Sequence, residues 1–267
     1  MAGGGWTLPM GSSYWKMSHA FLSTDWIYNF DGSELKINQT GVYISSLYAE
    51  YGVHKKVTIM AYIPFLYRST FGQVTLQPSG QVLNTDIYTA VGDIDLTTKF
   101  SVISNGPIVI SAALTLGIPI GSTNGGVSGL LQTGDGEFNQ KLQLDASHSF
   151  YPIPIWISCK IGINNRNKGF SDEYDYGLEI GASIKDRMNF ITKLDARESF
   201  MNGFRNELQA SNFSNDIEFI NLTIECNIKL FADLWLSMGV SRPFRGRKTL
   251  IANTYIIGMI WDLSQTK

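Results

Sequence analysis

Hydrophobic and polar residues alternate along most of the chain, which is typical of β-strands with two unlike faces. Positions 93–102 place Asp, Asp, Thr, Lys and Ser on one face and mainly apolar residues on the other. The same period of two recurs at 108–120, 155–164 and 220–230. Counting such segments predicts twelve strands, at 13–28, 40–53, 57–71, 91–104, 108–121, 138–151, 155–166, 174–185, 189–200, 217–231, 235–246 and 251–264.

The connections between these segments alternate in length. Tight turns are predicted at 54–56, 105–107, 152–154, 186–188 and 232–234, and long polar loops at 72–90, 122–137 and 201–216. A soluble β-sandwich or soluble barrel is the alternative, but its strands usually have about 5–6 residues. The segments here are about twice as long, close to the roughly 9–11 residues that a tilted strand needs to cross a bilayer. We therefore predict an all-β fold, a transmembrane up-and-down antiparallel β-barrel of about twelve strands.

Composition agrees with a membrane barrel and excludes other classes. Charged residues make up 16% of the chain, below the roughly 25% of an ordinary soluble domain. The net charge of −2 supplies no basic field for nucleic acid, so no nucleic-acid partner is expected. Aromatic residues gather near the strand ends, with Trp15, Phe100 and Trp261 toward the turns and Phe65 and Tyr255 toward the loops. Such girdles mark the two interfaces of a membrane barrel.

A bilayer offers the backbone no hydrogen-bond partner, so the last strand must pair with the first. A charge that faces lipid near mid-membrane costs about 2–4 kcal/mol, so the strand charges should point inward. The face of the strands that is predicted to point inward carries ten basic and eight acidic residues. These predicted pore-lining residues are Lys16, Glu50, Arg68, Asp93, Asp95, Lys99, Lys141, Asp145, Lys160, Arg166, Asp175, Glu179, Lys193, Asp195, Arg197, Glu225, Lys229 and Arg245.

Unlike charges should stand side by side on two neighbouring strands of this predicted barrel. Lys193 and Arg197 lie on the ninth strand, and Asp175 and Glu179 lie on the eighth. An antiparallel pair of strands brings such residues opposite one another. The near balance of inward charges predicts a lumen with weak ion selectivity, because strong selectivity needs rings of one sign.

Short segments that occur in order along the chain carry a resemblance to a known family. They are Gly3–Pro9, Ala49–Val53, Ala61–Phe65, Val91–Leu96 and Leu131–Glu137. Together they resemble a family of bacterial outer-membrane barrels that is transporter-like and related to the phenol meta-pathway outer-membrane protein family. The last strand, at Gly258–Leu263, is similar to the C-terminal β-signal of outer-membrane proteins. The resemblance implies a barrel fold in the bacterial outer membrane and hints at transport.

We expect an outer-membrane channel or transporter that passes small polar or amphipathic solutes. The alternative is a non-conducting structural or partner barrel within an outer-membrane complex, whose mixed charges pair across the interior and fill it. Residues 1–12 are expected to form a periplasmic N-terminal segment and 13–264 a single transmembrane barrel, with both termini on the periplasmic side. The expected partners are outer-membrane lipid and a small solute or partner protein, without a cofactor.

An enzymatic site is not expected. Some twelve-stranded barrels are lipases that use Ser, His and Asn on the outer wall, which makes the three histidines candidates. His148 neighbours two serines, but adjacent residues of a strand point to opposite faces and cannot bond. His19 faces outward and His54 lies in a short turn, and the sequence shows neither a partner. The carboxylates of Gly134–Glu137 are too few for a calcium site, so we expect a solvated turn and no metal.

Overall fold

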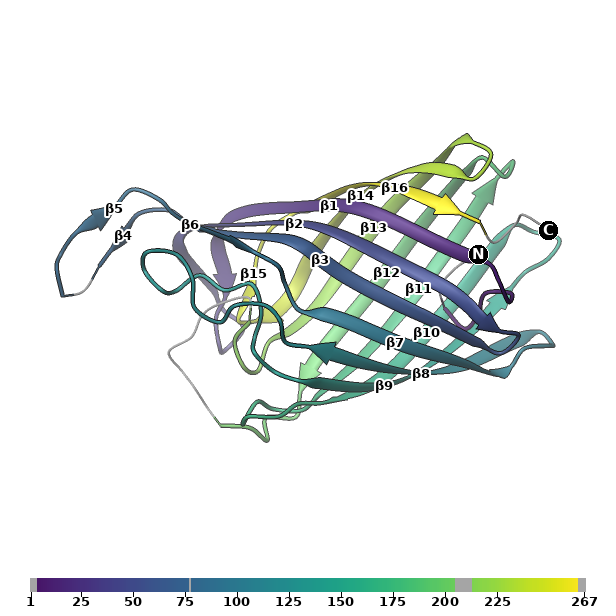
Figure 1. Ribbon diagram of the computed structural model, residues 1–267, viewed down its shortest axis with the longest axis horizontal. Coiled ribbons are helices and arrows are strands. Elements are labelled where there is room, and N and C mark those ends of the chain that lie inside the picture. Colours follow the sequence, from purple (N-terminus) through teal and green to yellow (C-terminus); the bar gives the residue numbers. More distant parts are fainter. Residues whose placement is uncertain (1–3, 77, 205–212, 264–267) are drawn as a thin grey trace.

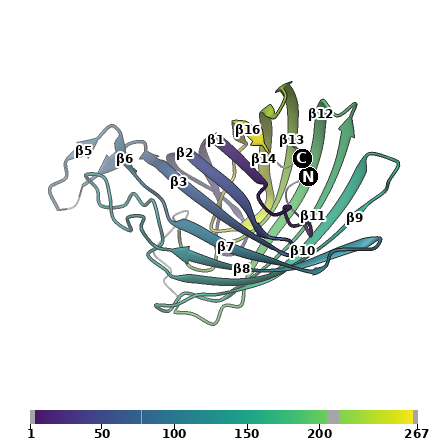
Figure 2. The ribbon, with the colours of Figure 1, turned by 45° about the vertical axis from the view of Figure 1, so that its right-hand side comes forward.

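The structure, a computed structural model, describes residues 4–76, 78–204 and 213–263. They form a closed antiparallel barrel of twelve strands (Figures 1 and 2). The strands and short extended segments are β1 (Ser13–Tyr28), β2 (Glu34–His54), β3 (Val57–Phe71), β4 (Val74–Thr75), β5 (Val82–Leu83), β6 (Asp86–Ala90), β7 (Ile94–Ile103), β8 (Ile108–Ile118), β9 (Asn139–Ser149), β10 (Ile155–Asn165), β11 (Glu173–Ile184), β12 (Met188–Ser199), β13 (Glu218–Phe231), β14 (Leu234–Arg247), β15 (Thr249–Leu250) and β16 (Thr254–Asp262).

The barrel closes because β1 pairs with β2 on one side and with β16 on the other. Two of the twelve wall strands are interrupted: β6 and β7 both pair with β3, and β15 and β16 both pair with β1. Residues at each interruption are hydrogen-bonded to the neighbouring strand. Gly92 N donates to Pro64 O at 2.9 Å, and Ile251 N donates to Trp26 O at 2.9 Å. The wall therefore has no free edge at either break, as a bilayer requires.

The prediction of a twelve-stranded antiparallel barrel is confirmed, and β1 and β3 have the predicted bounds. β2 begins at Glu34 rather than at residue 40. Its additional residues include Glu34 and Lys36. These charges interrupt the alternation by which the strand was predicted, but they are tolerated at the loop end, beyond the lipid. The loop predicted at 72–90 contains the β4–β5 hairpin, which projects from the loop end in Figure 1, and β6, which extends the wall.

The outer face of the barrel is apolar around its circumference. Large hydrophobic side chains there are exposed rather than packed, which is favourable only against lipid tails. They include Leu114, Leu142, Leu144, Ile161, Ile163, Leu178, Ile180, Leu222, Ile224 and Ile257. Within the described residues, no helix has the length and apolar character needed to cross a membrane.

Residues 4–8, part of the N-terminal segment expected at 1–12, lie inside the barrel. Gly5 N donates to Ser147 Oγ at 2.7 Å, and Leu8 N donates to Thr58 Oγ1 at 2.8 Å. The segment leaves the barrel past Gly52, where a Cβ would lie 2.1 Å from Pro9 O. Only glycine permits this approach. Residues 1–3 and 264 of the predicted units lie outside the described residues.

Candidate functional site

The barrel interior contains three adjoining cavities. The loop-side chamber has a volume of about 500 Å³, the middle chamber about 290 Å³ and the turn-side chamber about 840 Å³. Lys99 and Lys160 line both the first and the second chamber, and Glu179 and Lys193 line both the second and the third. Tyr48 lines all three. The shared lining makes the chambers one series from the loop end to the turn end, with Tyr48 at their junction.

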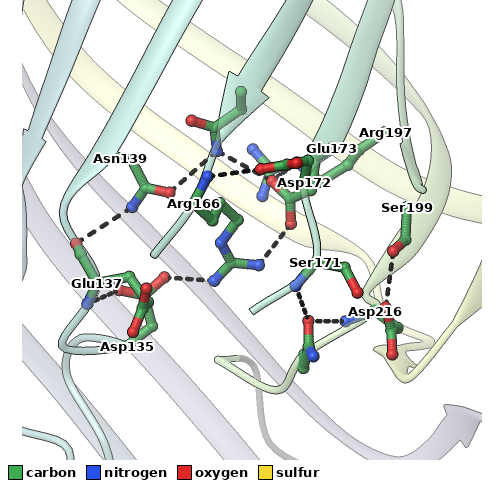
Figure 3. A network of polar contacts seen from close by, with 12 residues as sticks. Asp135, Glu137, Asn139, Arg166, Ser171, Asp172, Glu173, Arg197, Ser199 and Asp216 are labelled. Carbon is green, nitrogen blue, oxygen red and sulfur yellow. Dashed lines mark hydrogen bonds and ion pairs between the residues drawn. The ribbon is translucent and has the colours of Figure 1, made fainter. Parts of the chain in front are cut away.

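Ion pairs around Arg166 hold the mouth of the loop-side chamber (Figure 3). Arg166 Nη1 donates to Glu173 Oε1 at 2.8 Å, and Nη2 donates to Asp135 Oδ2 at 2.8 Å. The Arg166 side chain is only 5% exposed, and its guanidinium lies 4.3 Å from the centroid of the Phe170 ring. Glu173 begins β11, whereas Asp135 belongs to the loop at 119–138. Arg166 therefore ties this loop to the barrel wall.

Asp93, in the break between β6 and β7, holds the same loop. Its Oδ1 accepts a hydrogen bond from Gly121 N at 2.8 Å, and its Oδ2 accepts one from Asp135 N at 3.0 Å. A Cβ at Gly134 would lie 2.3 Å from Asp93 Oδ1, so a glycine is needed for the carboxylate to come this close. The base of the loop is thus fixed over the mouth at two points.

Asp86 holds the tip of the loop outside the membrane-spanning segments. Its carboxylate accepts hydrogen bonds from Val127 N and from Ser128 N, both at 2.9 Å, and from Ser128 Oγ. Burial raises the pKa of Asp86, but the hydrogen bonds from Ser128 and Val127 outweigh burial and hold this pKa below its usual range. The loop tip is therefore fixed by an ionised carboxylate.

Ion pairs continue along the inner wall toward the turn end. Asp175 stands opposite Arg197 and Glu179 opposite Lys193 in the β11–β12 register, which confirms the predicted side-by-side arrangement. The charged atoms of these two pairs lie 3.2 Å and 3.7 Å apart. Further pairs in the interior are Lys16–Glu225, Lys99–Asp145, Lys141–Asp175 and Lys160–Asp195.

The turn-side chamber differs from the loop-side chamber because aromatic rings form much of its lining. Trp156 Nε1 donates to Glu179 Oε1 at 2.9 Å, and Lys229 Nζ lies 5.5 Å from the centroid of a Trp235 ring. The aromatic lining residues are Trp6, Tyr14, Tyr48, Tyr151, Trp156 and Trp235.

A separate apolar cavity of about 290 Å³ lies at the loop end, against β2 and β3. No local pattern in the sequence predicts this cavity, because its lining comes from β2, β3 and β4, the loop at 119–138 and residues near 213 and 250. It adjoins a buried cluster of Ile27, Val42, Tyr67 and Leu250. Its apolar lining residues are Ile37, Val42, Phe71, Val74, Leu130, Leu131, Phe213 and Leu250.

Most of the charged residues predicted on the inner face lie in the interior. Fourteen line the three chambers or form the interior pairs described above, Lys229 contacts the Trp235 ring that lines the turn-side chamber, and Asp93 bonds the loop over the mouth. The fourteen are Lys16, Glu50, Asp95, Lys99, Lys141, Asp145, Lys160, Arg166, Asp175, Glu179, Lys193, Asp195, Arg197 and Glu225.

The inward positions predicted for Arg68 and Arg245 are corrected by the structure, which leaves both residues exposed. On β3, Pro64 and Phe65 together oppose one residue of β2, so the alternation shifts before Arg68. On β14, Phe244 is the additional residue between the partners of Ile220 and Asn221, and it shifts Arg245 in the same way. Proline within a strand often marks such a bulge, and Pro243 precedes Phe244 as Pro64 precedes Phe65.

Five interior carboxylates were absent from the prediction: Asp135, Glu137, Glu173, and Asp186 and Asp262, which line the turn-side chamber. The solvated turn expected at 134–137 is instead packed, since Glu137 is 1% exposed and Asp135 pairs with Arg166. Glu173 stands one residue before the predicted start of its strand, and no local signal marked the loop as inward-folding. With Arg68 and Arg245 outside and Lys185 added from the lining of the turn-side chamber, the described interior groups comprise nine basic and thirteen acidic residues, which gives the lumen an acidic excess.

The histidines lie on the outer wall or in a turn. His19, for which the sequence showed no partner, has Nδ1 at 3.0 Å from Ser45 Oγ and stacks on Phe21. In the described part of the chain, the other ring nitrogen of His19 forms no hydrogen bond with a carboxylate or an amide, so the pair lacks an orienting group. His148 contacts Pro107 O and the Phe150 ring.

Comparisons with known proteins identify the fold. No protein-family model matches the sequence, and no curated protein matches it. The solved COG4313 outer-membrane channel from Pseudomonas putida is similar, with a TM-score of 0.72 and 15% identity over 98% of both chains. The NanC porin has a TM-score of 0.52 at 8% identity, over 93% of this chain and 100% of that chain. The Ralstonia pickettii toluene transporter TbuX has a TM-score of 0.50 at 10% identity, over 96% and 90%.

This chain has the fold of an outer-membrane β-barrel. At such low identities the likeness concerns the fold alone. The structure itself supplies the location, because a closed barrel with an apolar exterior and a charged interior is stable in the bacterial outer membrane and would expose a large apolar surface in water.

Proposed function

We propose that the protein is an outer-membrane channel or transporter for small polar or amphipathic solutes, with the turn end toward the periplasm. The observation that carries the proposal is the series of three chambers between the two ends of the barrel. A barrel whose interior is filled by paired side chains would leave little space for three cavities of about 290 to 840 Å³ in its lumen.

The apolar cavity at the loop end supports an amphipathic solute. It lies against β2 and β3, next to the mouth of the charged loop-side chamber, and Ser69 Oγ donates to Gln132 O at 2.7 Å where the loop meets this wall. A solute with an apolar part and a polar part finds a complementary surface for each. Three of the similar structures are also proteins of this kind: one is an outer-membrane channel, one is a toluene transporter, and one, KdgM, is a porin in complex with oligogalacturonate.

Membership of the transporter-like family related to the phenol meta-pathway protein family is part of this proposal. The segments that carry the resemblance meet in space. Gly92 N bonds Pro64 O, Thr133 Oγ1 donates to Val91 O at 2.9 Å, and Asp135 N bonds Asp93. Three separate segments of the sequence thus build one structure at the mouth, which supports their being a functional set.

Single-channel recording on protein reconstituted in planar bilayers tests the proposal. We expect conduction with a modest preference for cations, because the interior carries an acidic excess. The double variant Lys193→Gln, Arg197→Gln should shift the reversal potential further toward cations, and Glu179→Gln should shift it in the opposite direction. Absence of conduction by the parent protein, where a known porin conducts, would overturn the proposal and favour the non-conducting structural or partner barrel.

A further inference from the structure

The turn-side chamber contains a buried carboxylate that forms no ion pair with any described residue. Glu50 is 3% exposed and lines the chamber, and its Oε1 accepts a hydrogen bond from Tyr48 Oη at 2.7 Å. Within the described residues it forms no ion pair, whereas Glu179 and Glu225, which line the same chamber, each pair with lysine. A buried charge without a partner is costly, so such a group is a candidate for ligand binding.

Three lysines near this carboxylate have other partners, and the first is Lys99, whose Nζ donates to Gly4 O at 2.7 Å and lies 3.8 Å from Asp145 Oδ2. Lys16 stands beside Glu50 on the neighbouring strand, since their cross-strand partners are Tyr48 and Tyr14. Lys16 Nζ nevertheless lies 2.8 Å from Glu225 Oε1, and Lys193 Nζ lies 3.8 Å from Glu225 Oε2. Two ammonium groups therefore converge on one carboxylate, and Glu50 is left facing the cavity.

Aromatic rings line the same chamber as this carboxylate. The Tyr14 ring meets the Tyr48 ring edge-on, with centroids 6.2 Å apart, and Trp156 lines the same chamber. Aromatic faces attract cations through the ring quadrupole, above all when the cation carries apolar groups that shed water easily. The chamber already holds one such contact, because Lys229 Nζ lies 5.5 Å from the centroid of a Trp235 ring.

We propose that the turn-side chamber is a binding site for a small organic cation, an ammonium group on an apolar or aromatic body. Glu50 is its counter-ion, and Tyr14, Tyr48 and Trp156 surround its apolar part. The volume of about 840 Å³ lies in the range of small-molecule sites. The inference rests on the proposed function, since it names the class of solute for which the lumen is built, and anions are disfavoured by the carboxylates at 50, 179 and 225.

The experiment measures binding apart from conduction. Phenethylammonium, 2-phenylethanol and phenylacetate are titrated into the detergent-solubilised full chain, with calorimetry and tryptophan fluorescence as readouts. These probes share a ring and differ in charge, and the comparison needs no variant. We expect the ammonium to bind about tenfold or more tightly than the alcohol, the ratio that one charge-assisted contact supplies. Equal affinities for the three probes would overturn the proposal.

Two single substitutions test whether Glu50 is the counter-ion of the bound ammonium. Glu50→Gln keeps the shape and removes the charge, so the preference for the ammonium over the alcohol should disappear. Asp95→Asn is the matched control, because Asp95 also lacks an ion pair in the described residues but lines the loop-side chamber; it should retain the preference. A preference that survives Glu50→Gln would overturn the assignment. If the protein conducts but binds the three probes equally, the cation site is refuted and the channel is not. If the protein prefers the ammonium but does not conduct, the channel is refuted and the cation site remains.

Discussion

The two ends of the lumen use charge differently. In the loop-side chamber, Arg166 and Arg197 are each held between two carboxylates, and the loop that covers the mouth is part of the same network. In the turn-side chamber, two lysines converge on Glu225 while Glu50 has no ion pair in the described residues. Paired charges fix structure, whereas an unpaired buried charge is available to a ligand. Under the proposed function, we therefore expect the loop end to regulate access and the turn end to select the solute.

The largest expected effect comes from removing the central cation of the loop-side network. Arg166→Met leaves Asp135 and Glu173 without that partner, and breaking a buried pair in this way costs about 3–5 kcal/mol. We expect the loop at 119–138 to leave the mouth, single-channel conductance to rise, and limited proteolysis to cut the loop. Arg247→Met is the control, because its pair with Glu218 is more exposed and spans 3.6 Å. Unchanged conductance and proteolysis would show that Arg166 does not close the mouth.

The second prediction concerns the outer and inner faces of β8 in the barrel wall. Leu114 is 47% exposed on the outer face, whereas Thr115 lines the loop-side chamber. Leu114→Arg should impair assembly by about 2–4 kcal/mol, because it places a charge in lipid, and Thr115→Arg should be tolerated. The measurement is the fraction of protein that shows the folded mobility on gels before boiling. Equal fractions for the two variants would contradict the assignment of the two faces.

The third prediction uses pH to release the loop tip and leave the barrel folded. Because the pKa of Asp86 is held below its usual range by hydrogen bonds, the stabilisation is complete above about pH 4 and is lost as pH falls through the lowered pKa. Amides of Val127 and Ser128 should then exchange faster, after correction for intrinsic rates. Asp86→Asn should remove this pH dependence. Exchange that stays constant across the acid range in the parent would contradict the Asp86 tether.

The smallest expected effect is at Arg68, which the sequence placed in the lumen. The structure turns it outward, where Arg68 Nε donates to Thr89 Oγ1 at 3.1 Å. Arg68→Gln should therefore leave the reversal potential unchanged and alter stability by less than about 0.5 kcal/mol, as for most surface changes. A shift in ion selectivity as large as that of the Lys193→Gln, Arg197→Gln variant would show that Arg68 lines the pore after all.

Local alternation predicted the wall well because the barrel obeys it over most of its length. β1 and β3 have the predicted bounds, and Asp175 and Glu179 meet Arg197 and Lys193 as the strand order requires. The alternation was misleading at Pro64 and Pro243, where an additional residue enters the strand and every later side chain changes face.

What the sequence by itself determined was the class of fold, its strand number and the face on which most charges lie, because a bilayer allows only a closed sheet with an apolar exterior. Only the tertiary structure decided which charges neutralise one another. Asp135 and Arg166 come from separate connections, and Lys16 reaches Glu225 on a distant strand. Such pairings depend on loop path and side-chain reach across the lumen, which a period of two residues does not encode, and they leave Glu50 unpaired within the described residues.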